Sequence, residues 1–229
     1  MSYYGSYHAY LQDRIAFARR VGEGACGGSY GDAMLILSAI LSSLAAGLWP
    51  GEGKDRRRFV EIWATYSPPD LKPNLISVPR LLASLEKEGH HDLVKKVRST
   101  HPRAFIVDTL MVTGEDVDKT EVELVALVPE LHIWQLRNFS YGNVFYRNVR
   151  SGYTHLYRPT EYARDYSMVD ELESVRYVNV NNLGYRPIYF PISWVADLVE
   201  SVLTRVTTSG CDQPLPDPQP WWVDSRPEL

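Results

Sequence analysis

The sequence predicts a mainly α-helical bundle that carries one or two small β-hairpin insertions. Apolar residues recur at steps of three and four along most of the 229 residues, a spacing typical of amphipathic helices. One segment, residues 33–48, is apolar on almost every side, which suits the central helix of a bundle. Stretches rich in β-branched and aromatic residues are short and lie near residues 104–126 and 175–190.

The N-terminal part of the chain is expected to form two helices. Residues 2–24 place tyrosines and aliphatic side chains on one helical face. Asp32 stands directly before the apolar segment 33–48, where we expect it to be the N-cap, and Trp49-Pro50-Gly51 should end that helix. Because the segment is shorter than the ~20 residues that cross a bilayer, we expect a buried helix, with a membrane span as the alternative.

Two further helical segments follow. The basic run 54–58 leads into an apolar pattern over residues 59–66, and Asp55 is the expected cap. We expect the arginines of this run to be solvated, with nucleic-acid contact as the alternative. Ser77 then begins a helix that is interrupted at residues 89–92, after which helical spacing resumes.

Each β-prone region is expected to form an insertion in the helical domain. In the first region, residues 105–107 and 121–125 are β-prone and are separated by an acidic segment, 114–118, that should be a solvated loop. In the second region, two β-prone runs within residues 175–190 flank residues 181–184, whose Asn-Asn-Leu-Gly sequence suits a hairpin turn.

The helical pattern returns at Pro129 and continues to Pro159, and residues 192–206 should form a last amphipathic helix. These patterns predict a single domain over residues 1–207. Residues 208–229, rich in proline and tryptophan, are expected to form an extended C-terminal tail.

Composition excludes several classes of protein. The formal net charge of −4 argues against a basic nucleic-acid coat, although a local basic site is compatible with it. Cys26 and Cys211 lie far apart in no metal-ligand spacing, and nothing resembles a signal peptide, so we expect free thiols in the cytoplasm. The chain has no P-loop, dinucleotide-binding fingerprint, nucleophile elbow or zinc spacing, and we expect neither a cofactor nor a metal.

One stretch, residues 146–157, concentrates side chains suited to phosphate chemistry. Its twelve positions hold two arginines, a histidine, three tyrosines, a serine and a threonine. Arginine presents a fixed fork of donors that matches phosphate, and histidine can move a proton near neutral pH. The alternative is that the stretch forms no functional site, with its tyrosines in the core and its arginines at the rim of the core.

Geometry restricts how this stretch can form a site. On one straight helix, Arg150 and His155 would point roughly 140° apart and stand about 7.5 Å apart along the axis. Arg147, Ser151 and His155 would instead share a face at steps of four. A site that uses both Arg150 and His155 therefore needs a break near Gly152, a helix end there, or a second copy of the chain around a twofold axis.

Residues 150–157, Arg-Ser-Gly-Tyr-Thr-His-Leu-Tyr, resemble the Arg-x4-6-His motif of the HEPN superfamily in its longer Arg-x4-His-x-Tyr form. The helical layout, with an early apolar helix and a late motif, is similar to HEPN domains. Residues 44–51 followed by 55–61 also resemble uncharacterised bacterial HEPN-like proteins. The chain departs from many HEPN ribonucleases in having Ser151 where they have Asn, Asp or His.

The resemblance implies a metal-independent endoribonuclease of the toxin or defence type that acts as a homodimer and leaves 2′,3′-cyclic phosphate ends. By the same resemblance His155 would move the proton and Arg150 would stabilise charge on the phosphate. Ser151, Tyr157 and Arg147 would support or contact the substrate. Tyr157 would also be a candidate for modification by an antitoxin.

The alternative is a non-catalytic HEPN-like domain that binds RNA or another protein. Ser151 and the acidic isoelectric point of about 5.9 favour this alternative. An antitoxin or effector protein is the corresponding partner, and the tail with Trp221-Trp222 is a candidate contact for it.

Overall fold

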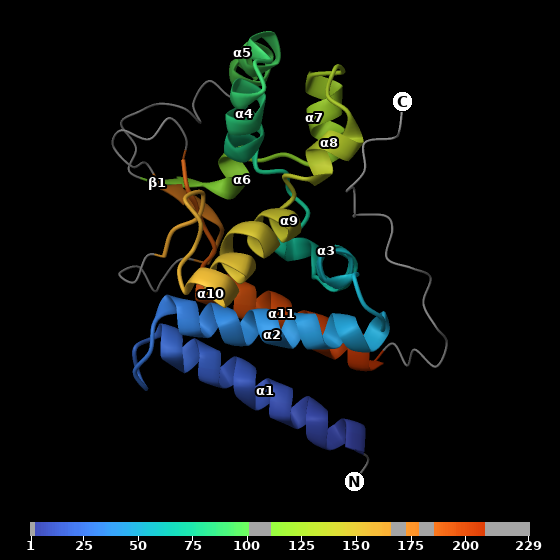
Figure 1. The fold of residues 1–229 in the computed structure, drawn as a ribbon, viewed down its shortest axis with the longest axis vertical. Helices are drawn as coiled ribbons and strands as arrows, with labels where there is room; N and C mark the ends of the chain where they lie inside the picture. The colour runs from blue at the N-terminus through green and yellow to red at the C-terminus, as the bar shows by residue number, and fades with distance from the viewer. Residues whose placement is uncertain (1–2, 101–110, 166–172, 179–185, 209–229) are drawn as a thin grey trace.

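The computed structural model describes residues 3–100, 111–165, 173–178 and 186–208. Within these ranges the chain is mainly helical with one small three-stranded sheet, which confirms the predicted fold class. The helices of its base are α1 (Tyr3–Gly22), α2 (Tyr30–Leu48), α3 (Asp55–Tyr66) and α11 (Ile192–Thr208). Helices α1 and α2 lie side by side, and α11, far away in sequence, packs against both (Figure 1).

Helix α2 is the central element of this base. Ser29 is its N-cap and forms a reciprocal capping box with Asp32, whose carboxylate accepts a bond from the Ser29 N–H at 2.7 Å. The prediction that Asp32 is itself the N-cap is therefore wrong, because the helix begins at Tyr30, three residues earlier than expected. Among the described helices α2 alone is long and apolar enough to cross a membrane, and half of its most apolar window is buried inside the protein.

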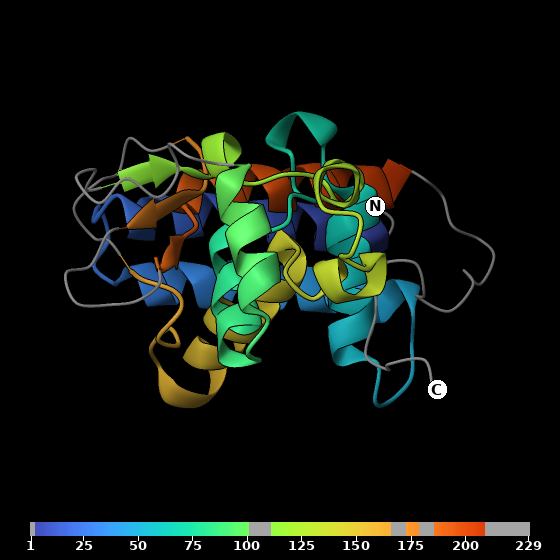
Figure 2. The same cartoon turned by 90° about the horizontal axis from the view of Figure 1, so that it is seen from above.

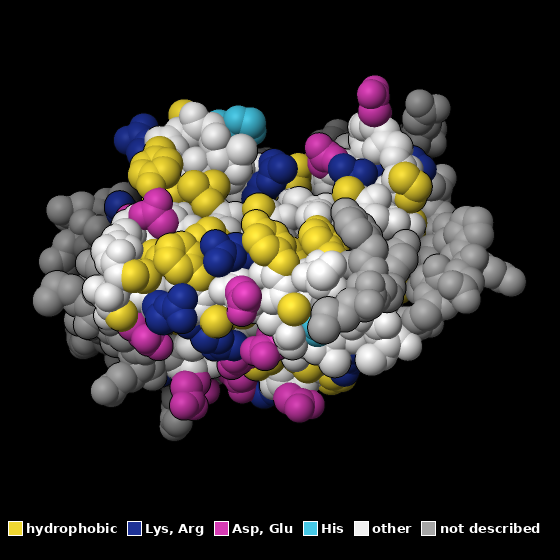
Figure 3. Space-filling view, turned by 90° about the horizontal axis from the view of Figure 1, so that it is seen from below, with side chains coloured by type: hydrophobic (Ala, Val, Ile, Leu, Met, Phe, Trp, Pro, Cys, Tyr) yellow, Lys and Arg dark blue, Asp and Glu magenta, His cyan; other side chains and the backbone are white. Residues whose placement is uncertain are grey.

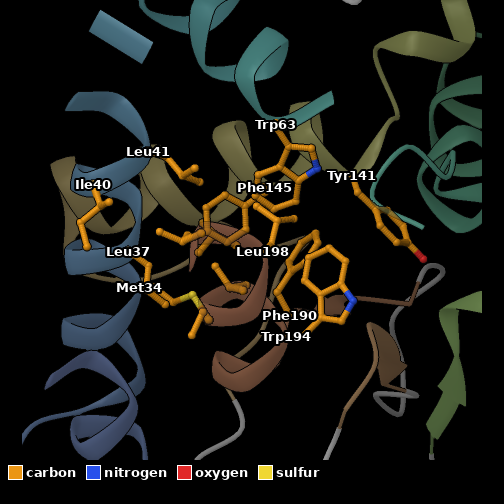
Figure 4. Packing of buried hydrophobic residues seen from close by; sticks show 14 of the residues in the cluster. Met34, Leu37, Ile40, Leu41, Trp63, Tyr141, Phe145, Phe190, Trp194 and Leu198 are labelled. Atoms are coloured by element: carbon orange, nitrogen blue, oxygen red, sulfur yellow. The ribbon is translucent and has the colours of Figure 1, made fainter. Parts of the chain in front are cut away.

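The main core lies between α2, α3 and α11 (Figure 4). Met34 and Leu37 of α2 point toward the ring of Phe145, which lies 5.0 Å from Trp63 and 5.2 Å from Phe190 between ring centroids. Phe145 is fully buried and ends helix α9 (Tyr141–Phe145). Because aromatic pairs at these separations attract beyond their burial, this cluster fixes the position of the segment that follows.

Above the base stands a second layer with its own core, seen over α2 and α11 in Figure 2. Its elements are α4 (Val78–Lys87), α5 (His91–Ser99), α6 (Gly114–Val117), α7 (Glu121–Leu127) and α8 (Ile133–Arg137), with a 3₁₀ turn, η1 (Pro69–Leu71), before α4. Helix α4 starts directly after Ser77, where a helix was predicted to begin, and Ser77 caps it by accepting a bond from the Arg80 N–H. The prediction of a β-prone run at 121–125 is wrong: Thr120 and Glu123 form a capping box that starts α7 there.

The sheet joins segments that are distant in sequence. Its order is β1 (Met111–Thr113), β2 (Arg176–Val178) and β3 (Ile188–Tyr189), with antiparallel pairing throughout. The pairing of β2 with β3 agrees with the expected second hairpin, whose turn at 181–184 lies outside the described residues. The first region forms no hairpin of its own within its described part, because β1 pairs with β2 and the β-prone run 105–107 is not described.

Candidate functional site

The motif segment leaves the core through a π-helical turn. Phe145 is followed by η2 (Tyr146–Arg150), in which the Ser151 N–H donates to the Tyr146 carbonyl, and then by α10 (Ser151–Leu156). The backbone stays helical across the junction, with φ/ψ of −56°/−53° at Arg150 and −68°/−36° at Ser151. A π-turn holds one more residue than an α-turn and occurs frequently at functional sites. It also moves Arg147 out of the step-of-four alignment with Ser151 and His155 that a straight α-helix would give.

The inner side of the motif segment is closely packed. Val149 and Tyr153 are buried, and the Tyr153 ring lies 6.0 Å from that of Tyr30 between centroids. A Cβ on Gly152 would stand 2.6 Å from the carbonyl oxygen of Arg158, so only glycine lets the returning chain pass this closely. Gly152 therefore provides a contact surface within α10, and the chain does not break there.

Arg150 and His155 occupy different surroundings. The Arg150 guanidinium is half-buried, with its Cζ 4.9 Å from the centroid of the Tyr146 ring, a separation suited to a cation–π contact. No carboxylate in the described part of the chain pairs with it. The His155 side chain is exposed, and it has no hydrogen bond or ion pair to any described residue.

One copy of the chain does not bring Arg150 and His155 together. Because residues 150 to 155 follow one continuous helix, the two side chains leave it roughly 140° apart. Neither a break at Gly152 nor a helix end there is present. Arg147 is exposed and Ser151 is half-buried on the same segment.

Tyr157 is held at the start of α2. It adopts a left-handed conformation with φ of 52°, which ends α10, and its hydroxyl donates to the Asp32 carboxylate. This bond, followed by the bond from the Ser29 side chain, lowers the pKa of Asp32, and the same pairing raises the pKa of Tyr157. Sequence reasoning did not connect Asp32 with the motif, because the two lie 125 positions apart and nothing local signals the contact.

The basic run of α3 lies beside the motif segment. Arg56 donates from its Nε (3.0 Å) and Nη2 (2.8 Å) to the Oδ1 of Asn143, a buried residue of α9. One turn further along α3, Phe59 packs against the ring of Tyr146 at 5.2 Å between centroids. Asp55 is not the N-cap of this helix as expected: Lys54 occupies that position, and Asp55 pairs with Arg58. Helix α3 therefore packs against the turn that carries Arg150, while Arg56 and Arg58 of the basic run bond to Asn143 and Asp55.

A second tyrosine–carboxylate cluster is buried between the two cores. Asp118 is 2% exposed and accepts hydrogen bonds from the hydroxyls of Tyr141 (2.7 Å) and Tyr177 (2.6 Å) and from the Val78 N–H (2.8 Å). Burial outweighs these bonds and raises the pKa of Asp118 to about 7. The prediction that Asp118 belongs to a solvated loop is wrong, because two distant tyrosines enclose it.

The face formed by α1 carries mixed charge (Figure 3). Arg14 lies between the rings of Tyr10 and Phe17, 5.5 and 5.4 Å from their centroids. Arg19 is paired with Asp197 and Glu200 of α11 at 2.6 and 3.0 Å. Acidic side chains border the basic ones across this view, so the described side chains of this face do not form a continuous basic patch of the kind that binds a nucleic-acid backbone.

Within the described residues, no group of three or more His, Cys, Asp or Glu side chains is arranged to hold a metal ion. Cys26 is an exposed free thiol, and Cys211 lies outside the described residues.

No protein-family model, curated protein or solved structure matches the chain. Function must therefore be argued from the geometry of the site together with the motif itself.

Proposed function

We propose that this protein is a metal-independent, HEPN-type endoribonuclease that works as a cytoplasmic homodimer. In this proposal Arg150 of one copy and His155 of another complete a single site. The cleaved RNA ends in a 2′,3′-cyclic phosphate. No cofactor is required.

The observation that carries the proposal is the state of Arg150. Its guanidinium is half-buried on the Tyr146 ring, and no described carboxylate neutralises it. A half-buried guanidinium that no carboxylate neutralises is available to bind an anion. The π-turn that ends on Arg150, together with the fork of donors that a guanidinium presents, supports a phosphate as that anion.

The helix geometry supports the second copy in this proposal. Since the two side chains diverge on one continuous helix, a phosphodiester held by Arg150 is served by a histidine from elsewhere. A twofold axis beside α10 would bring two such segments together and create two equivalent sites. The exposed His155 at the end of the segment is accessible for this arrangement.

The proposed chemistry balances without a metal. His155 takes the proton of the ribose 2′-hydroxyl, whose oxygen forms a bond to the adjacent phosphorus. The bond from phosphorus to the 5′-oxygen breaks, that oxygen takes a proton from a water molecule, and the protonated His155 returns its proton to solvent. Arg150 stabilises the charge on the non-bridging oxygens, Ser151 orients one of them, and Tyr157 and Arg147 contact the substrate.

Incubation of the purified protein with mixed RNA in EDTA tests this activity. We expect fragments with cyclic phosphate ends, and His155→Ala should lower the rate by about 10²–10⁴-fold. His91→Ala is the matched control, because His91 is also exposed but lies on α5, away from the motif. Unchanged cleavage by His155→Ala would contradict the mechanism. RNA retained without any product ends would favour the non-catalytic alternative.

A further inference from the structure

Tyr157, the residue that ends α10, combines an unfavourable backbone conformation with an exposed side chain. Its φ of 52° lies in the left-handed region, which favours glycine and strains a bulky residue. Its side chain is nevertheless 62% exposed, so the ring buries little apolar surface that would offset the strain. Residues held in this region without being glycine cluster at ligand-binding sites.

The hydroxyl of Tyr157 is already used within the protein. It donates to the carboxylate of Asp32, which also accepts the N–H and the hydroxyl of Ser29. The hydroxyl proton is therefore not available to a phosphate of the substrate. What remains for a ligand is the ring itself, on which no aromatic ring or cation of the described chain stacks. The bond to Asp32 also fixes the outer end of the ring, so less freedom is lost when a ligand binds to it.

A cation follows this ring directly in the chain. Arg158 is exposed, and its guanidinium makes no hydrogen bond or ion pair within the described part of the chain. Its backbone is held against α10, because its carbonyl oxygen lies close to Gly152 and the N–H of Thr160 donates to the Asn148 carbonyl at 3.0 Å. Consecutive Cα atoms lie about 3.8 Å apart, so the Tyr157 ring and the Arg158 guanidinium can contact one nucleotide and its neighbour.

An exposed ring followed by a free cation suits a single-stranded nucleic acid. An unpaired base stacks on an aromatic side chain, and this contact tolerates any base because each has a π-face. A guanidinium binds the phosphate next to that base. A paired base, in contrast, is stacked between its neighbours in the duplex, and it reaches the ring only if it leaves the helix.

We infer that the proposed ribonuclease acts on single-stranded RNA, with Tyr157 stacking on an unpaired base beside the cleaved bond and Arg158 binding the adjacent phosphate. His155 stands two residues before Tyr157, which keeps the stacked base close to the reacting 2′-hydroxyl. The inference rests on the ribonuclease proposal, to which it adds a substrate class and a further binding residue, Arg158.

RNA that carries 2′-O-methyl groups separates binding from cleavage, because it lacks the attacking hydroxyl. Fluorescently labelled 2′-O-methyl oligo(A), oligo(U) and the duplex of the two are titrated with the full chain, and fluorescence anisotropy gives the affinities. We expect the single strands to bind at least about tenfold more tightly than the duplex. Tyr157→Ala should weaken single-strand binding about tenfold or more, whereas Tyr157→Phe, which keeps the ring, should stay within about threefold of the wild type.

Arg158→Gln tests the phosphate contact in the same titrations. We expect single-strand binding about tenfold weaker at low salt, together with a smaller dependence of the affinity on salt. Tyr10→Ala and Lys95→Gln are the matched controls, because both residues are exposed and lie on α1 and α5, outside the motif segment. Circular dichroism verifies that the variants are folded.

Equal losses in Tyr157→Ala and Tyr157→Phe would overturn the inference, since the hydroxyl rather than the ring would then be the contact. So would affinities of Tyr157→Ala or Arg158→Gln equal to those of the controls, or a duplex bound as tightly as its strands. Cleavage of mixed RNA in EDTA is measured on the same preparations. A protein that cleaves RNA without these binding differences contradicts this inference alone, whereas a protein that cleaves no RNA contradicts the ribonuclease proposal and this inference with it.

Discussion

Two clusters in this protein pair a carboxylate with tyrosine hydroxyls, yet the two carboxylates respond in opposite directions. Asp32 accepts the Tyr157 hydroxyl at the exposed end of the motif, and its pKa is lowered. Asp118 accepts two tyrosine hydroxyls between the cores, and its pKa is raised to about 7. The kind of hydrogen bond is shared, so the difference is due to burial, which disfavours the charged form.

The two clusters differ in solvent access: the Asp118 cluster is enclosed by the protein, whereas the motif cluster is accessible to a ligand. The Asp118 cluster joins Val78 of the upper core to Tyr141 and Tyr177 of the main core, and solvent hardly reaches it. The motif cluster packs closely on its inner side but leaves Tyr157 62% exposed, together with an exposed His155. We therefore expect substitutions at the first cluster to change stability and those at the second to change activity.

The largest expected effect is the pH dependence that Asp118 imposes on stability. The unfolded carboxyl releases its proton near 3.8 and the folded one near 7, so the folded state holds the extra proton between these values. The free energy of unfolding should therefore fall as the pH rises from about 4 to about 7, by on the order of 4 kcal/mol from this group. Urea unfolding at several pH values should show this fall reduced in Asp118→Asn. Asp116→Asn, at an exposed site on α6, is the control, and parallel profiles for both variants would argue against a buried acid.

A glycine pair tests how closely the motif segment is packed. A Cβ at position 152 would meet the Arg158 carbonyl oxygen at 2.6 Å, whereas a Cβ at Gly47 of α2 would meet nothing within 4 Å. Gly152→Ala should thus lower the free energy of unfolding by about 1–3 kcal/mol, while Gly47→Ala should raise it by up to about 1 kcal/mol. Urea unfolding measures both changes. A stabilising Gly152→Ala would mean that the returning chain does not lie against α10.

Phenylalanine substitutions at Tyr141 and Tyr157 test the difference between the two clusters directly. Tyr141→Phe removes a bond to the buried Asp118 and should cost about 2 kcal/mol, because a buried acceptor loses its donor. Tyr157→Phe removes a bond that the exposed Tyr157 makes to the half-buried Asp32, and it should change stability by less than about 0.5 kcal/mol. Thermal unfolding at neutral pH gives both values. Equal losses would show that burial does not separate the two clusters.

The smallest expected effect is on the titration of Asp32. Since the Tyr157 hydroxyl is the main cause of its lowered pKa, Tyr157→Phe should move that pKa upward toward its ordinary value. The stability contributed by Asp32 is present at neutral pH and is lost as the pH falls through its lowered pKa. Side-chain carboxyl shifts followed by NMR between pH 2 and 6 would measure the change. If Asp32 titrates identically in the wild-type protein and in Tyr157→Phe, the Tyr157 hydroxyl does not bond to Asp32.

Local signals in the sequence predicted much of the fold. Ser77 and the apolar segment 33–48 identified helices that the structure contains, since caps and periodicity act within a few residues. The run 121–125 forms a helix although its side chains favour a strand, because Thr120 and Glu123 supply a capping box at its start. Pairing of β1 with β2 had no local signal at all, because the two strands are far apart in sequence.

For the candidate site as well, the sequence carried local signals but no record of long-range contacts. The types and spacing of Arg150 and His155 pointed to the motif segment, and the helix arithmetic anticipated their divergence. The π-turn and the contact of Tyr157 with Asp32 depend on packing against α2 and α3, which spacing along the chain does not record. The burial of Asp118 likewise depends on Tyr141 and Tyr177, which lie 23 and 59 positions away.

The most direct test of the proposed site is complementation between two inactive variants. Arg150→Ala and His155→Ala, each inactive alone, are mixed under conditions that exchange subunits, and cleavage of RNA in EDTA is measured. If each site combines Arg150 of one copy with His155 of the other, every mixed dimer regains one intact site, and activity should return to about a quarter of the wild-type value. A mixture that stays inactive while the wild-type protein cleaves RNA would contradict a site shared between two copies.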